Sequence, residues 1–348
     1  MKKIIILVSS TGAGHKIAGI SIKELIEDIK GEEVPLIDAL KLSKFPYSIS
    51  DKIYYFLSNL PSLWKFFYYL SNDEKYEKFL KIQNFFLQDT LKKIVENTKP
   101  DIIFCTHPFF VPVLNELKSI KKFQIISVIT DFGEIHKAWL INNYDLLWIP
   151  SEFTKKEIEK KTGLKGNYEV LGYPVRRGFR NITELKKDYI LIMGGGRGAG
   201  PILEIFKILK NFKIKEIYIC GTNEKLKNKL LKVKEEKKLD HIEIIGYTDR
   251  IYELMKDAFI IISKPGGSTV AESNYLLKPL IAINPLPGQE QGNANFIKET
   301  DSGLVLDKLN YLSNYIEEII KEKKKFEFKE KIRDYSEKQI KFIKDFIL

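Results

Sequence analysis

A histidine directly after a glycine loop is the first feature of this sequence that could do chemistry. His15 stands in "IIILVSSTGAGHKIAG", where an apolar run predicts a buried strand, small residues predict a loop, and a helix is expected from about Lys16. This layout resembles a phosphate site, but the Walker spacing is absent, and Ile17 replaces the small residue of a dinucleotide fingerprint. Two interpretations stay open: His15 caps the helix above a tight turn, or it is a reactive imidazole.

A second glycine loop, "MGGGRGAG", follows the predicted strand Tyr189–Met193 and precedes a helix with Pro201 near its start. Backbone N–H groups at a helix N-terminus suit an anionic phosphate. The loop contains Gly195, Gly196 and Arg197. Nicotinamide dinucleotide binding is disfavoured, because no acidic residue ends the next strand, "EIYICGTN".

A third loop, "KPGGST", is predicted to lead from a strand into a helix, as a diphosphate site requires. Glu272 has two interpretations: it forms a capping box with Thr269, or it accepts hydrogen bonds from ribose hydroxyls. Further on, "GQEQGNAN" gathers amide and carboxylate side chains that suit a hydroxyl-rich ligand such as a hexose. The residues of these two stretches are Pro265, Gly266, Gly267, Ser268, Thr269, Gln289, Glu290 and Asn293.

The composition is that of a globular protein, and 348 residues are enough for two domains. Two cysteines and four histidines show no metal-ligand spacing, so no metal is expected. No segment reaches the roughly 20 apolar residues that span a bilayer.

The net charge of +11 has three interpretations. It reflects a composition bias, it serves to bind nucleic acid, for which no motif is found, or it serves to bind an anionic membrane surface. We expect a cytoplasmic protein, peripherally associated with the inner face of the cell membrane.

The stretch from Phe45 to Lys92 supports the membrane interpretation, because 14 of its 48 residues are aromatic, against 12% of the chain. Aromatic rings interleaved with lysines suit the headgroup boundary. The alternative is an ordinary helical core stripe. The residues expected to meet membrane or acceptor are Trp64, Lys65, Phe66, Phe67 and Tyr68.

Apolar runs alternate with helical stretches along the whole chain, which predicts parallel sheets covered on both faces. The series occurs twice and indicates two Rossmann-like α/β domains, residues 1–175 and 185–327, joined by "GYPVRRGFRNITELKKD". A helix is also predicted at about residues 328–348, and one interpretation is that it packs against the first domain. The predicted strands are Lys3–Ser9, Val34–Ala39, Ile102–Thr106, Gln124–Thr130, Leu146–Pro150, Tyr189–Met193, Glu216–Cys220, Ile242–Gly246, Phe259–Ser263, Pro279–Asn284 and Gly303–Leu306.

These motifs together resemble the family-28 glycosyltransferases, specifically the diacylglycerol glycosyltransferases that include monogalactosyldiacylglycerol synthase. The resemblance extends from "TGAGHKIA" through "TDFGEIHKAWL", "GYPVRRGF" and "MGGGRGAG" to "KPGGSTVAESNYLLKPLIAINPLPGQEQGN". It departs from the family in the first loop, which reads Gly-Ala-Gly-His instead of three glycines. The resemblance implies a GT-B fold of two facing domains and a metal-independent, inverting transfer of a hexose from a UDP-sugar to a lipid, most simply diacylglycerol.

The resemblance also implies roles for individual residues. His15 is the expected base, with Asp131 and His136 as orienting or alternative groups, whereas His107 is expected to be structural. For the donor, the "KPGGST" turn is expected to contact the diphosphate and Glu272 the ribose. The hexose is assigned to Gln289, Glu290 and Asn293, and the uracil to Gly246 and Tyr247. Further donor contacts are expected from Gly14, Arg176, Gly195, Gly196 and Arg197. Two alternatives remain: an enzyme like the UDP-sugar 2-epimerases acting on a soluble sugar, and a non-catalytic module that binds UDP-sugar or membrane.

Overall fold

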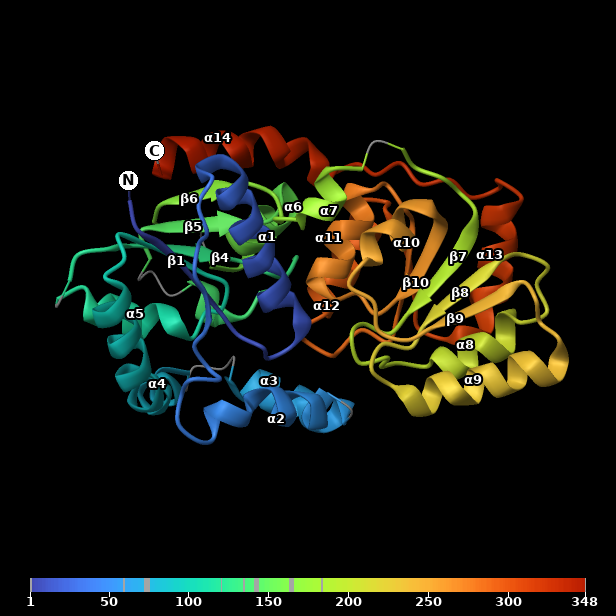
Figure 1. Ribbon diagram of the computed structural model, residues 1–348, viewed down its shortest axis with the longest axis horizontal. Helices are drawn as coiled ribbons and strands as arrows, with labels where there is room; N and C mark the ends of the chain where they lie inside the picture. The colour runs from blue at the N-terminus through green and yellow to red at the C-terminus, as the bar shows by residue number, and fades with distance from the viewer. Residues whose placement is uncertain are drawn as a thin grey trace. The chain divides into compact units, whose positions relative to one another are not determined.

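The computed structural model describes residues 2–58, 60–71, 76–119, 121–133, 135–140, 144–162, 166–182 and 184–347. It divides into two compact units. The first comprises Met1–Arg177, Leu286–Asn293 and Ile332–Leu348, and the second comprises Gly178–Pro285 and Ala294–Lys331. Each unit is built on one six-stranded sheet, and all strand pairings are parallel (Figure 1).

The first sheet has the strand order β2-β1-β3-β4-β5-β6. Its strands are β1 (Ile4–Val8), β2 (Leu36–Asp38), β3 (Ile102–Cys105), β4 (Gln124–Val128), β5 (Leu146–Ile149) and β6 (Tyr168–Val170). The helices of this unit are α1 (Ala13–Lys30), α2 (Ser50–Ser58), α3 (Pro61–Ser71), α4 (Tyr76–Thr98), α5 (Phe110–Leu117), α6 (Glu152–Thr162) and α14 (Ser336–Ile347), with 3-10 turns at Tyr47–Ile49, Lys137–Leu140 and Ile332–Tyr335.

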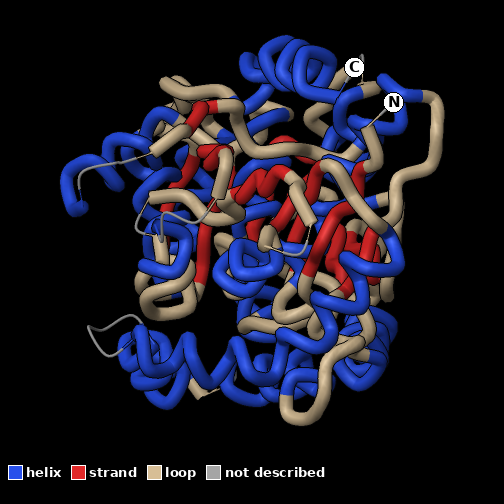
Figure 2. Tube along the Cα trace, turned by 90° about the vertical axis from the view of Figure 1, so that its left-hand side faces the viewer, coloured by secondary structure: helices blue, strands red, loops and turns tan. Residues whose placement is uncertain are grey.

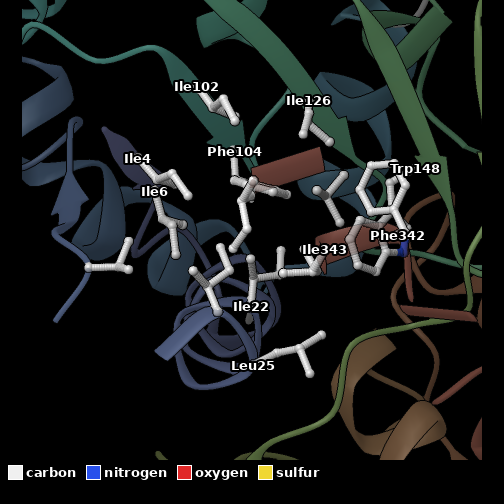
Figure 3. Packing of buried hydrophobic residues seen from close by; sticks show 14 of the residues in the cluster. Ile4, Ile6, Ile22, Leu25, Ile102, Phe104, Ile126, Trp148, Phe342 and Ile343 are labelled. Atoms are coloured by element: carbon white, nitrogen blue, oxygen red, sulfur yellow. The ribbon is translucent and has the colours of Figure 1, made fainter. Parts of the chain in front are cut away.

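Strand β1 shows why this sheet is covered on both faces. Side chains alternate along a strand, so Ile4 and Ile6 point to one face and Ile5 and Leu7 to the other. The first face packs against α1 and α14, as Figure 3 shows for residues such as Ile22 and Phe342. The second face packs against α4 and α5. A continuous apolar run is therefore what this position in the sheet requires.

The second sheet has the order β12-β11-β10-β7-β8-β9. Its strands are β7 (Tyr189–Met193), β8 (Glu216–Ile219), β9 (Ile242–Ile245), β10 (Ala258–Ser263), β11 (Leu280–Ile283) and β12 (Gly303–Leu306). The helices of the rest of the chain are α7 (Arg177–Arg180), α8 (Ile202–Leu209), α9 (Glu224–Lys237), α10 (Ile251–Asp257), α11 (Gly267–Tyr275), α12 (Gln291–Glu299) and α13 (Leu312–Ile320), with a 3-10 turn at Leu309–Tyr311. Figure 2 shows the strands in red among blue helices.

The structure confirms the predicted fold class of two Rossmann-like α/β units with parallel sheets. All eleven predicted strands are present, with ends shifted by at most two residues. The apolar pattern did not predict β6, a three-residue edge strand. The predicted start of the first helix, near Lys16, was also wrong, since α1 begins at Ala13. Within the described ranges, no helix is long and apolar enough to cross a membrane.

Candidate functional site

Neighbouring strands β1, β3 and β4 end at the same edge of the first sheet, so the loops that follow them converge. The loop after β1 carries His15 in the first turn of α1, the loop after β3 carries Thr106 and His107, and the loop after β4 carries Thr130 and Asp131. Chemistry-bearing side chains from three distant segments are thereby brought together.

The ring of His15 is held by two partners from these loops. Its Nδ1 lies 2.7 Å from the Thr106 carbonyl oxygen and 2.8 Å from the Thr130 hydroxyl. The Thr106 hydroxyl in turn donates to the His15 carbonyl at 2.8 Å. The cap position of α1 is Gly12, and no side chain of the described residues caps it. The interpretation of His15 as a helix cap is therefore wrong.

These contacts set the proton position on His15. A carbonyl oxygen only accepts hydrogen bonds, so Nδ1 carries the proton, and Nε2 keeps its lone pair in the neutral ring. Burial of the ring lowers the pKa of His15 to about 4, although the hydrogen bond to Thr106 acts in the opposite direction. At neutral pH the imidazole is uncharged and can accept a proton at Nε2.

The other two histidines of this edge have different environments. His107 is only 5% exposed, and its ring packs against His15 with centroids 4.7 Å apart. His136 accepts at Nδ1 from the Ala138 N–H at 3.1 Å, so in its neutral form the proton sits on Nε2. Burial lowers the pKa of His136 to about 4. His15 and His136 are thus opposite tautomers, and His136 presents a donor where His15 presents an acceptor.

Asp131 is held by the loop Leu286–Asn293, which belongs to the first unit. The Asn293 amide donates to the Asp131 carboxylate at 3.3 Å, and its oxygen accepts from the Phe132 N–H at 2.6 Å. Burial raises the pKa of Asp131 to about 7, and the nearby negative charge of Glu290 adds to the increase, whereas the Asn293 hydrogen bond lowers it. Asp131 therefore changes charge near neutral pH.

The aromatic helix α3 has two different faces. Trp64 and Tyr68, one turn apart, turn inward: Tyr68 packs against His136 with ring centroids 5.5 Å apart. A side chain at Gly288 would collide with the Tyr68 ring, which shows how closely this loop approaches α3. Lys65 and Phe66 are exposed, Phe66 at 61%. The side chain of Phe67 lies outside the described residues.

In the second unit, the loop after β7 is folded tightly on the loop after β8. A Cβ on Gly198 or Gly221 would stand within 2.4 Å of a backbone oxygen, so only glycine fits at these positive-φ positions. Beside Gly195 and Gly196, by contrast, no described atom lies within 4 Å of where a Cβ would stand. Arg197 on the same loop is exposed. The loop therefore leaves open space beside its backbone.

The "KPGGST" segment leads from β10 into α11, whose cap position is Gly266. No capping side chain from the described part of the chain occupies the N–H groups of its first turn. Pro265 precedes the helix, while Gly267, Ser268 and Thr269 form its first turn. Because α11 begins two residues before Thr269, Thr269 is not the cap, and the capping-box interpretation of Glu272 is wrong. Glu272 is 4% exposed.

Four further predicted residues lie after a strand or next to the start of a helix. Gly246 and Tyr247 follow β9, and Tyr247 is 66% exposed. Gly14 lies in the first turn of α1, with no described atom near its Cβ position, and Arg176 lies half-buried before α7. Among the described residues, no group of three or more His, Cys, Asp or Glu could hold a metal ion.

Three residues at this site were not predicted: Thr106, Thr130 and Tyr54, whose hydroxyl donates to Gln289 Oε1 at 3.4 Å. The strand-end rule provides a signal for the two threonines, since each is the last residue of a predicted strand, Ile102–Thr106 or Gln124–Thr130. No local signal marks Tyr54, because its neighbours Tyr55 and Phe56 are aromatic too and only the fold distinguishes them.

Comparisons with known proteins match nearly the whole chain in two parts. Residues 15–175 match the family model of monogalactosyldiacylglycerol (MGDG) synthase, and residues 189–346 match the C-terminal domain of glycosyltransferase family 28. The processive diacylglycerol beta-glucosyltransferase of Bacillus pumilus is 27% identical over 94% of this chain and 88% of that protein. The probable chloroplastic monogalactosyldiacylglycerol synthase of Nicotiana tabacum is 29% identical over 87% of this chain and 61% of that protein.

Solved structures share the fold. MurG of Acinetobacter baumannii superposes with a TM-score of 0.61 at 12% identity, covering 99% of this chain and 100% of that one. The UDP-GlcNAc 2-epimerase of Methanocaldococcus jannaschii gives 0.58 at 15% identity, with coverage of 99% and 100%. At these identities the likeness concerns the GT-B fold alone. On the two family models and the relatives in sequence, the chain belongs to the family-28 glycosyltransferases, in the group that contains the monogalactosyldiacylglycerol synthases.

Proposed function

We propose that this enzyme transfers a hexose from a UDP-sugar to diacylglycerol with inversion at the anomeric carbon and without a metal ion. The observation that carries the proposal is the tautomer of His15 fixed by Thr106 and Thr130, whose Nε2 is left as a proton acceptor in the first turn of α1. The relatives named for diacylglycerol glucosyl transfer and monogalactosyldiacylglycerol synthesis support the substrate classes.

In the proposed reaction, the diacylglycerol hydroxyl loses its proton to His15 Nε2 as its oxygen attacks the anomeric carbon. The bond from that carbon to the diphosphate oxygen breaks on the opposite face, and UDP leaves with the electron pair. A base within hydrogen-bond reach of the hydroxyl is what this step requires. His136 is less suited to the role, because its Nδ1 lone pair already accepts from Ala138.

Asp131 supplies the negative charge in this proposal. Positive charge develops on the His15 imidazole and on the anomeric carbon as the reaction proceeds, and a carboxylate at the end of β4 would stabilise it. Because the pKa of Asp131 is about 7, the carboxyl is ionised only in part at neutral pH. Activity should therefore rise as the pH increases through 7.

The donor is assigned to the second unit and to the loop Leu286–Asn293. The first turn of α11 offers backbone N–H groups and the positive end of a helix to the leaving diphosphate. Arg176 and Arg197 are proposed to assist there, Glu272 to bind ribose, and Gly246 and Tyr247 to bind uracil. The open sides of Gly195 and Gly196 support a close approach of the nucleotide to this backbone.

The acceptor is proposed to reach the site from an anionic membrane surface. Helices α2 and α3 expose Ile53, Tyr55, Phe56, Leu63, Phe66 and Tyr69, each between 39% and 64% exposed. Lysines 52 and 65 lie exposed on the same helices. Apolar side chains with lysine heads match the boundary between headgroups and acyl chains, and we assign the enzyme a peripheral membrane location on this ground.

The function is tested by incubating the enzyme with UDP-glucose or UDP-galactose and vesicles that contain diacylglycerol. We expect a glycolipid with one of the two donors, the β-anomer from an α-linked UDP-sugar, and unchanged yield in the presence of a chelator. Absence of glycolipid with both donors would overturn the proposal. Conversion of a UDP-sugar without any acceptor would instead support the epimerase-like alternative.

The membrane face is tested by vesicle sedimentation. We expect binding to vesicles that contain phosphatidylglycerol, weakening as salt rises from about 0.05 to 0.5 M because exposed charges are screened. The double variant Phe56→Ser/Phe66→Ser should bind at least about tenfold more weakly, since two apolar anchors are lost. Leu185→Ser, an exposed apolar residue of the second unit, is the matched control. Salt-insensitive binding to neutral vesicles would contradict the electrostatic part.

A further inference from the structure

Tyr54 on α2 lies against the loop that carries His15 and contacts the loop Leu286–Asn293. Its ring covers Gly12, where a Cβ would lie 3.2 Å from the ring. Trp64 packs edge-on against that ring with centroids 5.1 Å apart. The Tyr54 hydroxyl donates to Gln289 Oε1 at 3.4 Å, a contact that joins α2 to the loop Leu286–Asn293.

The phenol of Tyr54 stays protonated under all working conditions. Burial raises the pKa of Tyr54, and the negative charges of Glu290 and Asp131 raise it further. A phenol that does not ionise is a donor to Gln289, not a base. Tyr54 is thus suited to fix the orientation of an amide and not to take the proton of the acceptor hydroxyl.

The three polar residues proposed for the hexose are not equivalent in the structure. Glu290 accepts from the Leu286 N–H at 2.8 Å and so closes its own loop. Asn293 uses both ends of its amide on Phe132 and Asp131. Gln289 contributes only its oxygen, to Tyr54, and its NH₂ group makes no hydrogen bond to the described residues. An amide whose oxygen is occupied presents its two N–H donors on the other side.

We propose that Tyr54 is a positioning residue for the donor sugar: by holding the oxygen of Gln289, it directs the Gln289 NH₂ group to a hydroxyl of the hexose. The inference rests on the proposed function, in which this loop binds the hexose. It assigns hexose discrimination to Gln289, because glucose and galactose differ in the orientation of one hydroxyl, and a fixed donor distinguishes the two orientations. Without Tyr54 the amide is free to flip and to present its oxygen instead.

The test uses Tyr54→Phe, Gln289→Ala and the double variant in the full-length protein. The Phe ring preserves the contacts with Gly12 and Trp64 and removes only the hydroxyl. We expect Tyr54→Phe to bind the preferred UDP-hexose about three- to tenfold more weakly while its affinity for UDP stays unchanged, since a weak neutral hydrogen bond is lost. The ratio of kcat/KM for UDP-glucose and UDP-galactose should move toward one. Tyr311→Phe, an exposed tyrosine in the second unit, is the control.

The double variant decides whether Tyr54 acts through Gln289. We expect it to bind UDP-hexose no more weakly than Gln289→Ala alone, because residues acting through one contact are not additive. Full additivity, or a Tyr54→Phe variant with wild-type hexose affinity and discrimination, would overturn the inference. Thermal unfolding and UDP titration establish that each variant is folded. If wild-type enzyme makes no glycolipid but the binding data hold, the proposed function fails and the positioning role stands.

Discussion

The two units use the same architecture in different ways. In each, a glycine loop follows the first strand of a parallel sheet and leads toward a helix. The loop of the first unit delivers a side chain, because His15 lies in the first turn of α1 and is fixed by Thr106 and Thr130. The second unit instead offers backbone, at Gly195 and Gly196 and in the first turn of α11. In the proposed function, proton transfer therefore belongs to the first unit and anion binding to the second.

The largest effect expected from this contrast is that of His15→Ala. Without the proposed base, kcat should fall by about 10²–10⁴-fold, while the Kd of UDP stays within about twofold, because the diphosphate contacts are proposed for the second unit. Initial rates and calorimetric UDP titration measure the two quantities. His241→Gln in the second unit is the control and should retain wild-type kcat. A His15→Ala enzyme with full activity would exclude His15 as the base.

The substitutions Gly196→Ala and Gly14→Ala compare the contributions of the two loops to UDP binding, since no described atom lies within 4 Å of either Cβ position. Gly196→Ala should weaken UDP binding at least about tenfold, because its methyl group occupies the space through which the nucleotide approaches. Gly14→Ala should weaken UDP binding much less, because the first loop is proposed to deliver the His15 side chain and not to bind the diphosphate. The change should also favour α1, where alanine is a better helix former than glycine. Equal losses of UDP affinity in both variants would show that the first loop also holds the anion.

Asp131→Asn tests the charge of the first site. The wild-type rate should increase with pH up to about 7, as Asp131 loses its proton. The asparagine variant should lose this dependence and run about tenfold below the wild-type plateau, while its side-chain oxygen keeps the contact with Asn293. The exposed Asp240→Asn is the control. A wild-type profile that is flat between pH 5 and 8, or an unaltered profile in Asp131→Asn, would remove Asp131 from the mechanism.

Most of the fold could be predicted from the sequence, because buried parallel strands are continuous apolar runs such as Ile4–Val8. Strand β6 could not, since its three residues include the charged Glu169, whereas β2, an equally short edge strand, lies in the more apolar stretch Val34–Ala39. The start of α1 was misplaced because its first turn contains a glycine, and the cap, Gly12, offers no capping side chain.

The site was predictable as a set of strand ends but not as a set of protonation states. The tautomer of His15 depends on Thr106, 91 residues away, and the clamp on Asp131 depends on Asn293, 162 residues away. The Gln289 amide is oriented by Tyr54, 235 residues away. Such partners are adjacent only after folding, so no spacing in the sequence distinguishes an occupied amide from an available one.

A substitution of Glu216 is expected to have the smallest effect on activity but a clear effect on stability. Glu216 at the start of β8 is fully buried and accepts from the Tyr218 hydroxyl at 2.6 Å. Burial raises the pKa of Glu216 from 4.5 to about 7, although the bond to Tyr218 lowers it. His15 and Asp131 of the first unit follow the carboxyl ends of its strands, whereas this carboxyl lies at the start of β8, at the other end from the loops proposed to bind the donor.

The pH dependence has a defined direction. The folded state binds the Glu216 proton more tightly than the unfolded state, so the contribution of Glu216 to the free energy of unfolding is largest below about pH 4.5 and declines until about pH 7. The full decline is about 3 kcal/mol, since each pKa unit corresponds to about 1.4 kcal/mol. Glu216→Gln keeps an acceptor for Tyr218 without the charge, so denaturant unfolding of the second unit should lose most of this slope and kcat should not change. The exposed Glu243→Gln on neighbouring β9 should keep the slope. If both variants retain it, the carboxyl at Glu216 is not the group that titrates, and the second unit owes its pH dependence to another residue.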